Sequence, residues 1–100
     1  MTEYERSTFE RALEHYGPDV QITVTIEELA ELQKELCKYR RGLARYDHIA
    51  EEIGDVSVML DQMQMLFQCG GAVQSWRLEK VRRLAERIEK EERYEDLQKR

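Results

Sequence analysis

The stretch IEELAELQKELCKYR, residues 26–40, followed closely by HIAEEIGDVSVMLDQMQMLF, residues 48–67, decides the fold. In the second stretch apolar side chains recur three and four residues apart, as on one face of an α-helix. These residues are Ile49, Ile53, Val56, Leu60, Met63 and Phe67. We predict a helix over residues 47–69, with Asp47 as its N-cap and Gly70-Gly71 at its end. Further apolar residues surround it, so we expect it to be buried on several sides, at the centre of the fold or of an oligomer.

Residues 20–26 allow two interpretations. Apolar and polar residues alternate there, which is typical of a strand; the apolar ones are Val20, Ile22, Val24 and Ile26. No partner strand is apparent elsewhere, and a lone strand cannot satisfy its backbone hydrogen bonds. We therefore predict one helix from about Asp19, as its N-cap, to about Arg41, with Gly42 as the C-terminal cap.

Two further helices complete the predicted fold, over residues 3–16 and 72–98. Gly17-Pro18 is expected to end the first of them. Charged residues make up 37% of the chain, with only one proline and five glycines, and this composition favours long helices. We expect an all-α antiparallel helical bundle in a single domain over residues 1–100. Since a chain of this size buries a thin core, we expect oligomerisation to complete the bundle.

The charge and the hydropathy of the chain exclude several classes of function. The net charge of −5 argues against binding to a nucleic-acid polymer, which requires a basic surface. No stretch resembles a signal peptide or a membrane span, so we expect a cytoplasmic protein that does not bind membranes. Cys37 and Cys69 lie inside helical patterns and are interpreted as reduced core residues.

Two pairs of acids stand out, Glu28 with Glu31 and Glu52 with Asp55. Residues three apart on a helix share one face. If the two helices pack antiparallel about a turn near residue 43 or 44, Glu31 and Asp55 each lie about 12 residues from its centre, at one level. The four carboxylates then converge, and such oxygen ligands suit Mg²⁺ or Mn²⁺ better than zinc. The alternative is that Glu28 and Glu31 are exposed helix acids and that Glu52 pairs with an arginine.

A di-iron carboxylate site is a chemical alternative to the proposed Mg²⁺ or Mn²⁺ site. Such a site would need Glu-x-x-His motifs. Ala12 stands three residues before His15, and Arg45 stands three residues before His48. The di-iron interpretation is therefore set aside.

The string EELAELQKE, followed by a short turn and EEIGDVSVML, resembles the MazG-like all-α nucleoside triphosphate pyrophosphohydrolases. The signature of that superfamily is an ExxE helix followed by an ExxD helix, and the resemblance covers about residues 20–67. It implies that Glu28, Glu31, Glu52 and Asp55 hold Mg²⁺. It also implies that the enzyme cleaves the α–β phosphate bond of a nucleoside triphosphate, giving a nucleoside monophosphate and pyrophosphate. Glu27 or Glu31 is then the general base, with the choice left open.

The resemblance also implies a homodimer or a homotetramer and a cationic phosphate site. The candidates for phosphate contacts are Lys34, Lys38, His48, Lys80 and Arg83, with Lys80 and Arg83 preferred. His48 stands where some related proteins have lysine, which is a departure from the pattern. Trp76 is either a stacking partner for a base or, in the favoured interpretation, a core or interface anchor. The alternative function is a non-catalytic helical interaction or regulatory module with a vestigial metal site.

Overall fold

A computed structural model describes residues 1–43 and 45–99 of the chain. Over these residues every regular element is an α-helix and there is no strand, so the predicted all-α class is confirmed. The helices are α1 (Glu3–Tyr16), α2 (Pro18–Arg40), α3 (Tyr46–Leu66) and α4 (Gly70–Gln98). The chain divides into two compact units, residues 1–68 and residues 69–100, which are described separately. That residues 1–100 form one domain stays a prediction.

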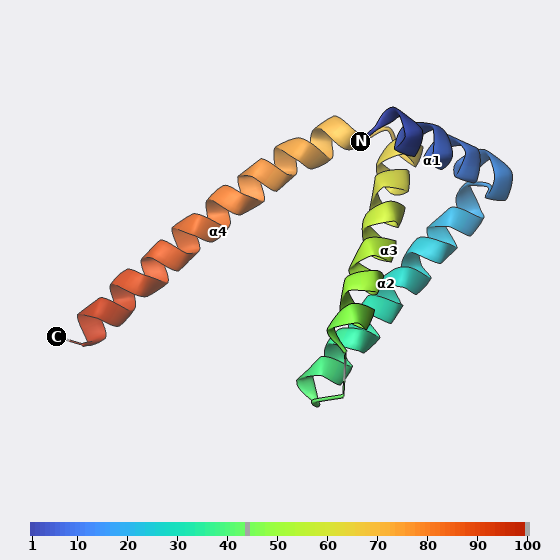
Figure 1. Cartoon of the computed structure of the whole chain (residues 1–100). Coiled ribbons are helices and arrows are strands. Elements are labelled where there is room, and N and C mark those ends of the chain that lie inside the picture. The colour runs from blue at the N-terminus through green and yellow to red at the C-terminus, as the bar shows by residue number, and fades with distance from the viewer. Residues whose placement is uncertain (44, 100) are drawn as a thin grey trace. The chain divides into compact units, whose positions relative to one another are not determined.

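The first unit is a helical hairpin closed at one end by a third helix. Helices α2 and α3 run antiparallel, side by side, and α1 packs against both at the end away from their turn (Figure 1). Phe9 is the buried residue of α1. An aromatic side chain is therefore the main anchor that holds α1 on the hairpin.

Helix α1 begins and ends where the sequence predicts. At its start the Glu5 amide donates to Thr2 Oγ1 over 3.1 Å, and the Thr2 amide donates to Glu5 Oε1 over 2.9 Å. This reciprocal pair is a capping box. At its end Gly17 adopts a φ of 91°, and Pro18 occupies the first turn of α2. The N-cap of α2 is thus Gly17, and the prediction that Asp19 caps it is wrong by two residues, because Pro18 fixes a helical φ already before Asp19.

The turn between α2 and α3 is built on Gly42. Its φ is 74°, its amide donates to the Tyr39 carbonyl, and the Leu43 amide donates to the Lys38 carbonyl, both over 2.9 Å. These two bonds form a Schellman motif and confirm the predicted role of Gly42 in ending α2.

Helix α3 begins and ends slightly earlier than the sequence predicts. Its N-cap is Arg45, whereas Asp47 lies in the first turn and accepts a 3.2 Å hydrogen bond from Arg45. The prediction of Asp47 as the cap is therefore wrong. The helix ends at Leu66, and the break falls at Gln68, whose φ is 51°. Gly70 begins α4 and does not end α3, because a glycine is tolerated in a first turn as well as at a C-terminal cap.

The interface between α2 and α3 is largely polar on the α2 side. The buried residues of α2 are Gln21, Thr25 and Glu35, and the buried residues of α3 are Val56, Met59 and Gln62. Gln21 Nε2 donates to Gln62 Oε1 over 2.6 Å. A buried amide pair of this kind fixes one register between two helices, because any slip leaves both amides without partners.

Within the first unit α3 is not buried on several sides, and its place at the centre of an oligomer stays a prediction. Ile53 is 51% exposed, Leu60 44% and Phe67 61%. Within this unit α2 and α1 cover one face of α3, and its other apolar side chains lie at the surface of the unit. Of the two cysteines, Cys69 is half-buried and Cys37 is exposed, so Cys37 is not a core residue.

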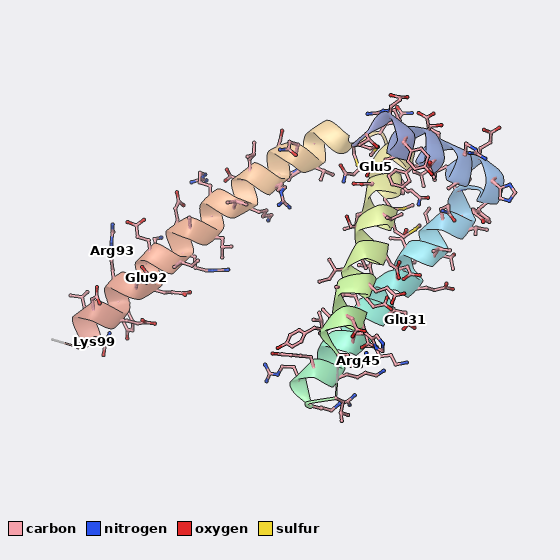
Figure 2. All side chains as sticks on the ribbon, viewed as in Figure 1. Glu5, Glu31, Arg45, Glu92, Arg93 and Lys99 are labelled. Carbon is pink, nitrogen blue, oxygen red and sulfur yellow. The ribbon has the colours of Figure 1, made fainter. Side chains whose placement is uncertain are left out.

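Helix α4 forms the second unit, and its side chains project from all sides of the helix (Figure 2). Glu79 is the half-buried residue among the described positions of α4, and the others are exposed. Glu79 accepts hydrogen bonds from Arg82 and Arg83, and Arg93 donates to Glu89. Such pairs at three- and four-residue spacing support a solvated helix. Within residues 1–43 and 45–99, no helix combines the length and the apolar character that a membrane crossing needs.

Candidate metal centre

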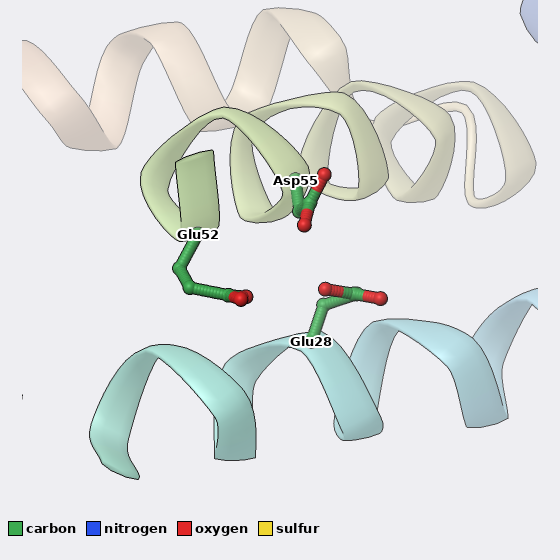
Figure 3. Close-up of side chains that lie close together, drawn as sticks. All are labelled: Glu28, Glu52 and Asp55. Carbon is green, nitrogen blue, oxygen red and sulfur yellow. The ribbon is translucent and has the colours of Figure 1, made fainter. Parts of the chain in front are cut away.

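Three carboxylates converge between the two long helices of the hairpin. Glu28 projects from α2 toward Glu52 and Asp55 on α3 (Figure 3). One carboxylate oxygen of each lies within 4.8 Å of the other two. Glu28 and Glu52 are half-buried and Asp55 is exposed, so the group opens to solvent on one side. This arrangement presents three oxygen ligands to one point while leaving room for water or substrate.

The register of the hairpin explains why these three acids meet. Gln21 is hydrogen-bonded to Gln62, Glu28 stands seven residues after Gln21, and Asp55 stands seven residues before Gln62. Seven residues are about two helical turns, or about 10 Å along the axis. The amide pair therefore aligns Glu28 with Asp55. Alignment of Glu31 with Asp55, as the sequence predicts, would need the register to differ by about one turn.

The acids repel one another, and this repulsion together with burial raises the pKa of two of them. Burial and the charges of Asp55 and Glu52 raise the pKa of Glu28. Burial and the charges of Asp55 and Glu31 raise the pKa of Glu52. Across residues 1–43 and 45–99, neither lysine nor arginine forms an ion pair with Glu28, Glu52 or Asp55. The alternative in which an arginine neutralises Glu52 therefore has no support in the first unit.

The group has the properties of a site for a hard divalent cation. Its donors are carboxylate oxygens only, which suit Mg²⁺ or Mn²⁺. Glu52 Oε2 is buried and lacks a hydrogen-bond partner among the described residues. A buried carboxylate oxygen without a partner is costly, and coordination to a cation would remove that cost.

Glu31, the fourth predicted ligand, lies outside the group of three. It is exposed on the surface of α2 (Figure 2). Its charge nevertheless raises the pKa of both Glu28 and Glu52, so it lies beside the group. Glu27, the other candidate for the general base, is also exposed. The roles of Glu27 and Glu31 stay predictions.

The predicted phosphate contacts of the first unit have different surroundings. Lys38 is half-buried, and its Nζ lies 3.2 Å from Glu35 Oε1. Lys34 and His48 are exposed. Lys34 and His48 can therefore reach a ligand freely, whereas Lys38 would have to leave Glu35 to do so.

The other two phosphate candidates belong to α4. Lys80 Nζ lies 5.7 Å and the Arg83 guanidinium carbon 6.0 Å from the centre of the Trp76 ring, which is within the range of a cation–π contact. The hydrogen bond from Arg82, then that from Arg83, lowers the pKa of Glu79 to about 2 despite its partial burial. Trp76 itself is 58% exposed, so within its own unit it is not a core anchor. Arg83 is held by its hydrogen bond to Glu79, so Lys80 is the freer of the two to contact a phosphate.

Sequence reasoning missed the buried polar residues of the hairpin, among them Gln21, Glu35 and Gln62. Glu35 Oε2 is buried and lacks a hydrogen-bond partner among the described residues, like Glu52 Oε2. The signal that could have found them is spacing: Gln21, Glu28 and Glu35 stand seven apart on α2, as do Asp55 and Gln62 on α3. Such spacing keeps residues on one helix face. Apolar periodicity alone does not reveal this spacing, because the residues that carry it are polar.

Comparison of the chain with models of protein families, with curated proteins and with solved structures finds no match.

Proposed function

We propose that this chain is a Mg²⁺-dependent nucleoside triphosphate pyrophosphohydrolase of the MazG-like type. The observation that carries the proposal is the convergence of Glu28, Glu52 and Asp55 within 4.8 Å across the hairpin. Both motifs that carry the resemblance, EELAELQKE and EEIGDVSVML, contribute ligands to this group of three carboxylates. The first contributes Glu28, and the second contributes Glu52 and Asp55.

The division of labour in the proposed site follows from burial and charge. Glu28, Glu52 and Asp55 would hold the cation. When bound, Mg²⁺ neutralises the phosphate oxygens and lowers the pKa of a water molecule. Glu31 is exposed and close enough to the group to influence it by charge, so it is the preferred acceptor for the proton of the attacking water. Lys34 and His48, both exposed, are the preferred phosphate contacts of the first unit.

The exposed apolar surface supports the proposal that the protein is a homo-oligomer. Leu29 and Leu36 on α2 are 45% and 47% exposed, in addition to the exposed apolar residues of α3. The first unit by itself leaves these side chains in water, whereas a second copy would cover them and thicken a thin core. A homodimer or homotetramer is therefore the proposed assembly.

A non-catalytic interaction module is the second candidate function. The same exposed apolar surface favours it, because a partner of another sequence would also cover these side chains. The three convergent acids count against it, since a mere docking surface gains nothing from a costly cluster of like charges.

The test of the enzyme proposal is pyrophosphate release. Purified protein with Mg²⁺ is screened against natural and modified ribonucleotides and deoxyribonucleotides, beside the double variant Glu52→Gln, Asp55→Asn. Glu51→Gln is the matched control, because Glu51 is exposed on the same helix and lies outside the group of three. Release by the wild type and the control, but not by the double variant, would support the proposal. Absence of release from every nucleotide would favour the interaction module.

A further inference from the structure

Helix α4 carries a regular face that its own unit leaves exposed. Val81 on this face is 58% exposed, Leu84 45% and Ile88 44%. Steps of four and three residues alternate along the face and continue past these apolar residues to charged residues at both ends. Six residues form this face, which is named the α4 seam: Arg77, Val81, Leu84, Ile88, Glu91 and Glu95. Alternating steps of this kind are typical of a helix that packs against one other helix in a coiled coil.

The charges of α4 are separated along the helix. Residues 76–88 hold five cationic and two acidic side chains, whereas residues 89–98 hold two cationic and five acidic ones. The ion pairs within α4 join Arg82, Arg83 and Arg93 to neighbouring glutamates outside the seam. Among the described residues, neither Arg77 nor Glu95, the two ends of the seam, forms an ion pair. The seam therefore has a basic end and an acidic end, and its own unit satisfies neither.

The two ends of the α4 seam match each other when two such helices run antiparallel. In a parallel pair Arg77 would meet Arg77 and Glu95 would meet Glu95, and both contacts repel. Arg77 stands seven residues before Leu84, and Glu95 stands seven residues after Ile88. Antiparallel contact of Leu84 with Ile88 of a second copy therefore places Arg77 opposite Glu95 of that copy. Two-fold symmetry provides each of these contacts twice.

We infer that α4 pairs antiparallel with α4 of a second copy of this chain through the α4 seam. The paired stretch from Arg77 to Glu95 is about 27 Å long. Its apolar centre is short, so the charges at its ends set the direction of pairing. An anionic lipid surface would attract the basic half of α4 and repel the acidic half, so a second copy fits these charges better. This interface is additional to the apolar surface of the first unit, and it depends on neither the cation site nor the proposed reaction.

The experiment measures self-association of the full chain by sedimentation equilibrium over a range of concentrations. The variants Arg77→Glu and Glu95→Arg each place like charges opposite one another at both ends of the pair. Each alone is expected to weaken self-association about tenfold. In an equimolar mixture of the two variants both ends carry opposite charges again, so association is expected to return to that of the wild type. Lys90→Glu is the matched control, because it makes the same charge change as Arg77→Glu on an exposed residue outside the seam, and circular dichroism verifies helix content.

Recovery in the mixture supports pairing between copies, because mixing cannot restore a contact that α4 makes within its own chain. Three outcomes overturn the inference. The first is a wild type that does not self-associate, and the second is a pair of single variants that associate as the wild type does. The third is weakened association without recovery in the mixture, which would assign the α4 seam to packing within one chain or to a partner of another sequence. Pyrophosphate release is a separate readout, so its absence would overturn the proposed function and leave this pairing standing.

Discussion

The hydrogen bond between Gln21 and Gln62 predicts a specific pattern of stabilities for two single variants and their combination. Both side chains are buried, at 6% and 4% exposure, and they share a 2.6 Å bond from Gln21 Nε2 to Gln62 Oε1. In Gln62→Leu the Gln21 amide stays buried without its acceptor. An unsatisfied buried amide costs about 1–3 kcal/mol. We take about 2 kcal/mol as the expected loss in the free energy of unfolding.

The variant Gln21→Leu is expected to lose a similar amount, because the Gln62 carbonyl oxygen then lacks its donor. Gln62 Nε2 keeps a weak contact with Met59 Sδ at 3.6 Å, which does not replace the lost bond. The double variant removes both polar groups and places two apolar side chains of similar size in contact. It is therefore expected to be at least about 1 kcal/mol more stable than the sum of the two single losses implies.

Urea unfolding followed by circular dichroism measures all four proteins. The slope of the transition verifies that unfolding stays two-state. Additive losses, with no recovery in the double variant, would refute the reasoning that these amides are a buried, mutually satisfied pair. The same result would remove the basis for the register that aligns Glu28 with Asp55.

Three further predictions follow from other parts of the first unit. Phe9→Ala is expected to cost about 3 kcal/mol in urea unfolding, because the ring is 6% exposed and anchors α1; a loss below about 1 kcal/mol would show that α1 does not depend on it. Gly42→Ala is expected to cost about 1 kcal/mol by thermal unfolding. The reason is the φ of 74° alone, since an added Cβ meets no atom within 4 Å. An unchanged melting temperature would contradict the Schellman turn. In EDTA at neutral pH, Glu52→Gln is expected to be more stable than the wild type. The raised pKa of Glu52 means that the folded state prefers the neutral form, and ionisation of this group opposes folding above that pKa. The advantage should shrink as the pH falls through the raised pKa and the wild-type carboxyl takes up its proton, and a constant advantage across this range would contradict the assignment.

The helices themselves were predictable because local signals set their ends. Gly17-Pro18 separates α1 from α2 whatever the tertiary packing, and Gly42 ends α2 through its own left-handed backbone. The alternation over residues 20–26 suggested a strand, yet these residues belong to α2. The absence of a partner strand indicates the helix, because an isolated strand cannot satisfy its backbone hydrogen bonds.

The register of the hairpin was not predictable from the turn alone. Counting outward from residues 43 and 44 paired Glu31 with Asp55, whereas the hairpin brings Glu28 to Asp55. The difference of about one turn arises because the Gln21–Gln62 pair fixes the helices at the far end from the turn. The periodicity of apolar residues does not predict a polar pair of this kind.

The sequence also does not predict how far the apolar residues of α3 are buried, and the reason is physical. Apolar periodicity tells which residues avoid water in the final assembly, but it does not tell which of them a single chain can cover. Ile53 and Phe67 follow the helical period and yet lie at the surface of the first unit. Their exposure is the feature that oligomerisation is proposed to relieve.

The measurement that tests the central claim most directly is calorimetric titration of Mn²⁺ into the wild type and into Glu28→Gln, with Glu51→Gln as the control of equal charge. If Glu28, Glu52 and Asp55 form one cation site, the wild type and the control bind Mn²⁺ and the affinity of Glu28→Gln falls at least about tenfold, because one of three carboxylate ligands is lost. Equal affinity for all three proteins, or absence of binding by the wild type, would contradict the account.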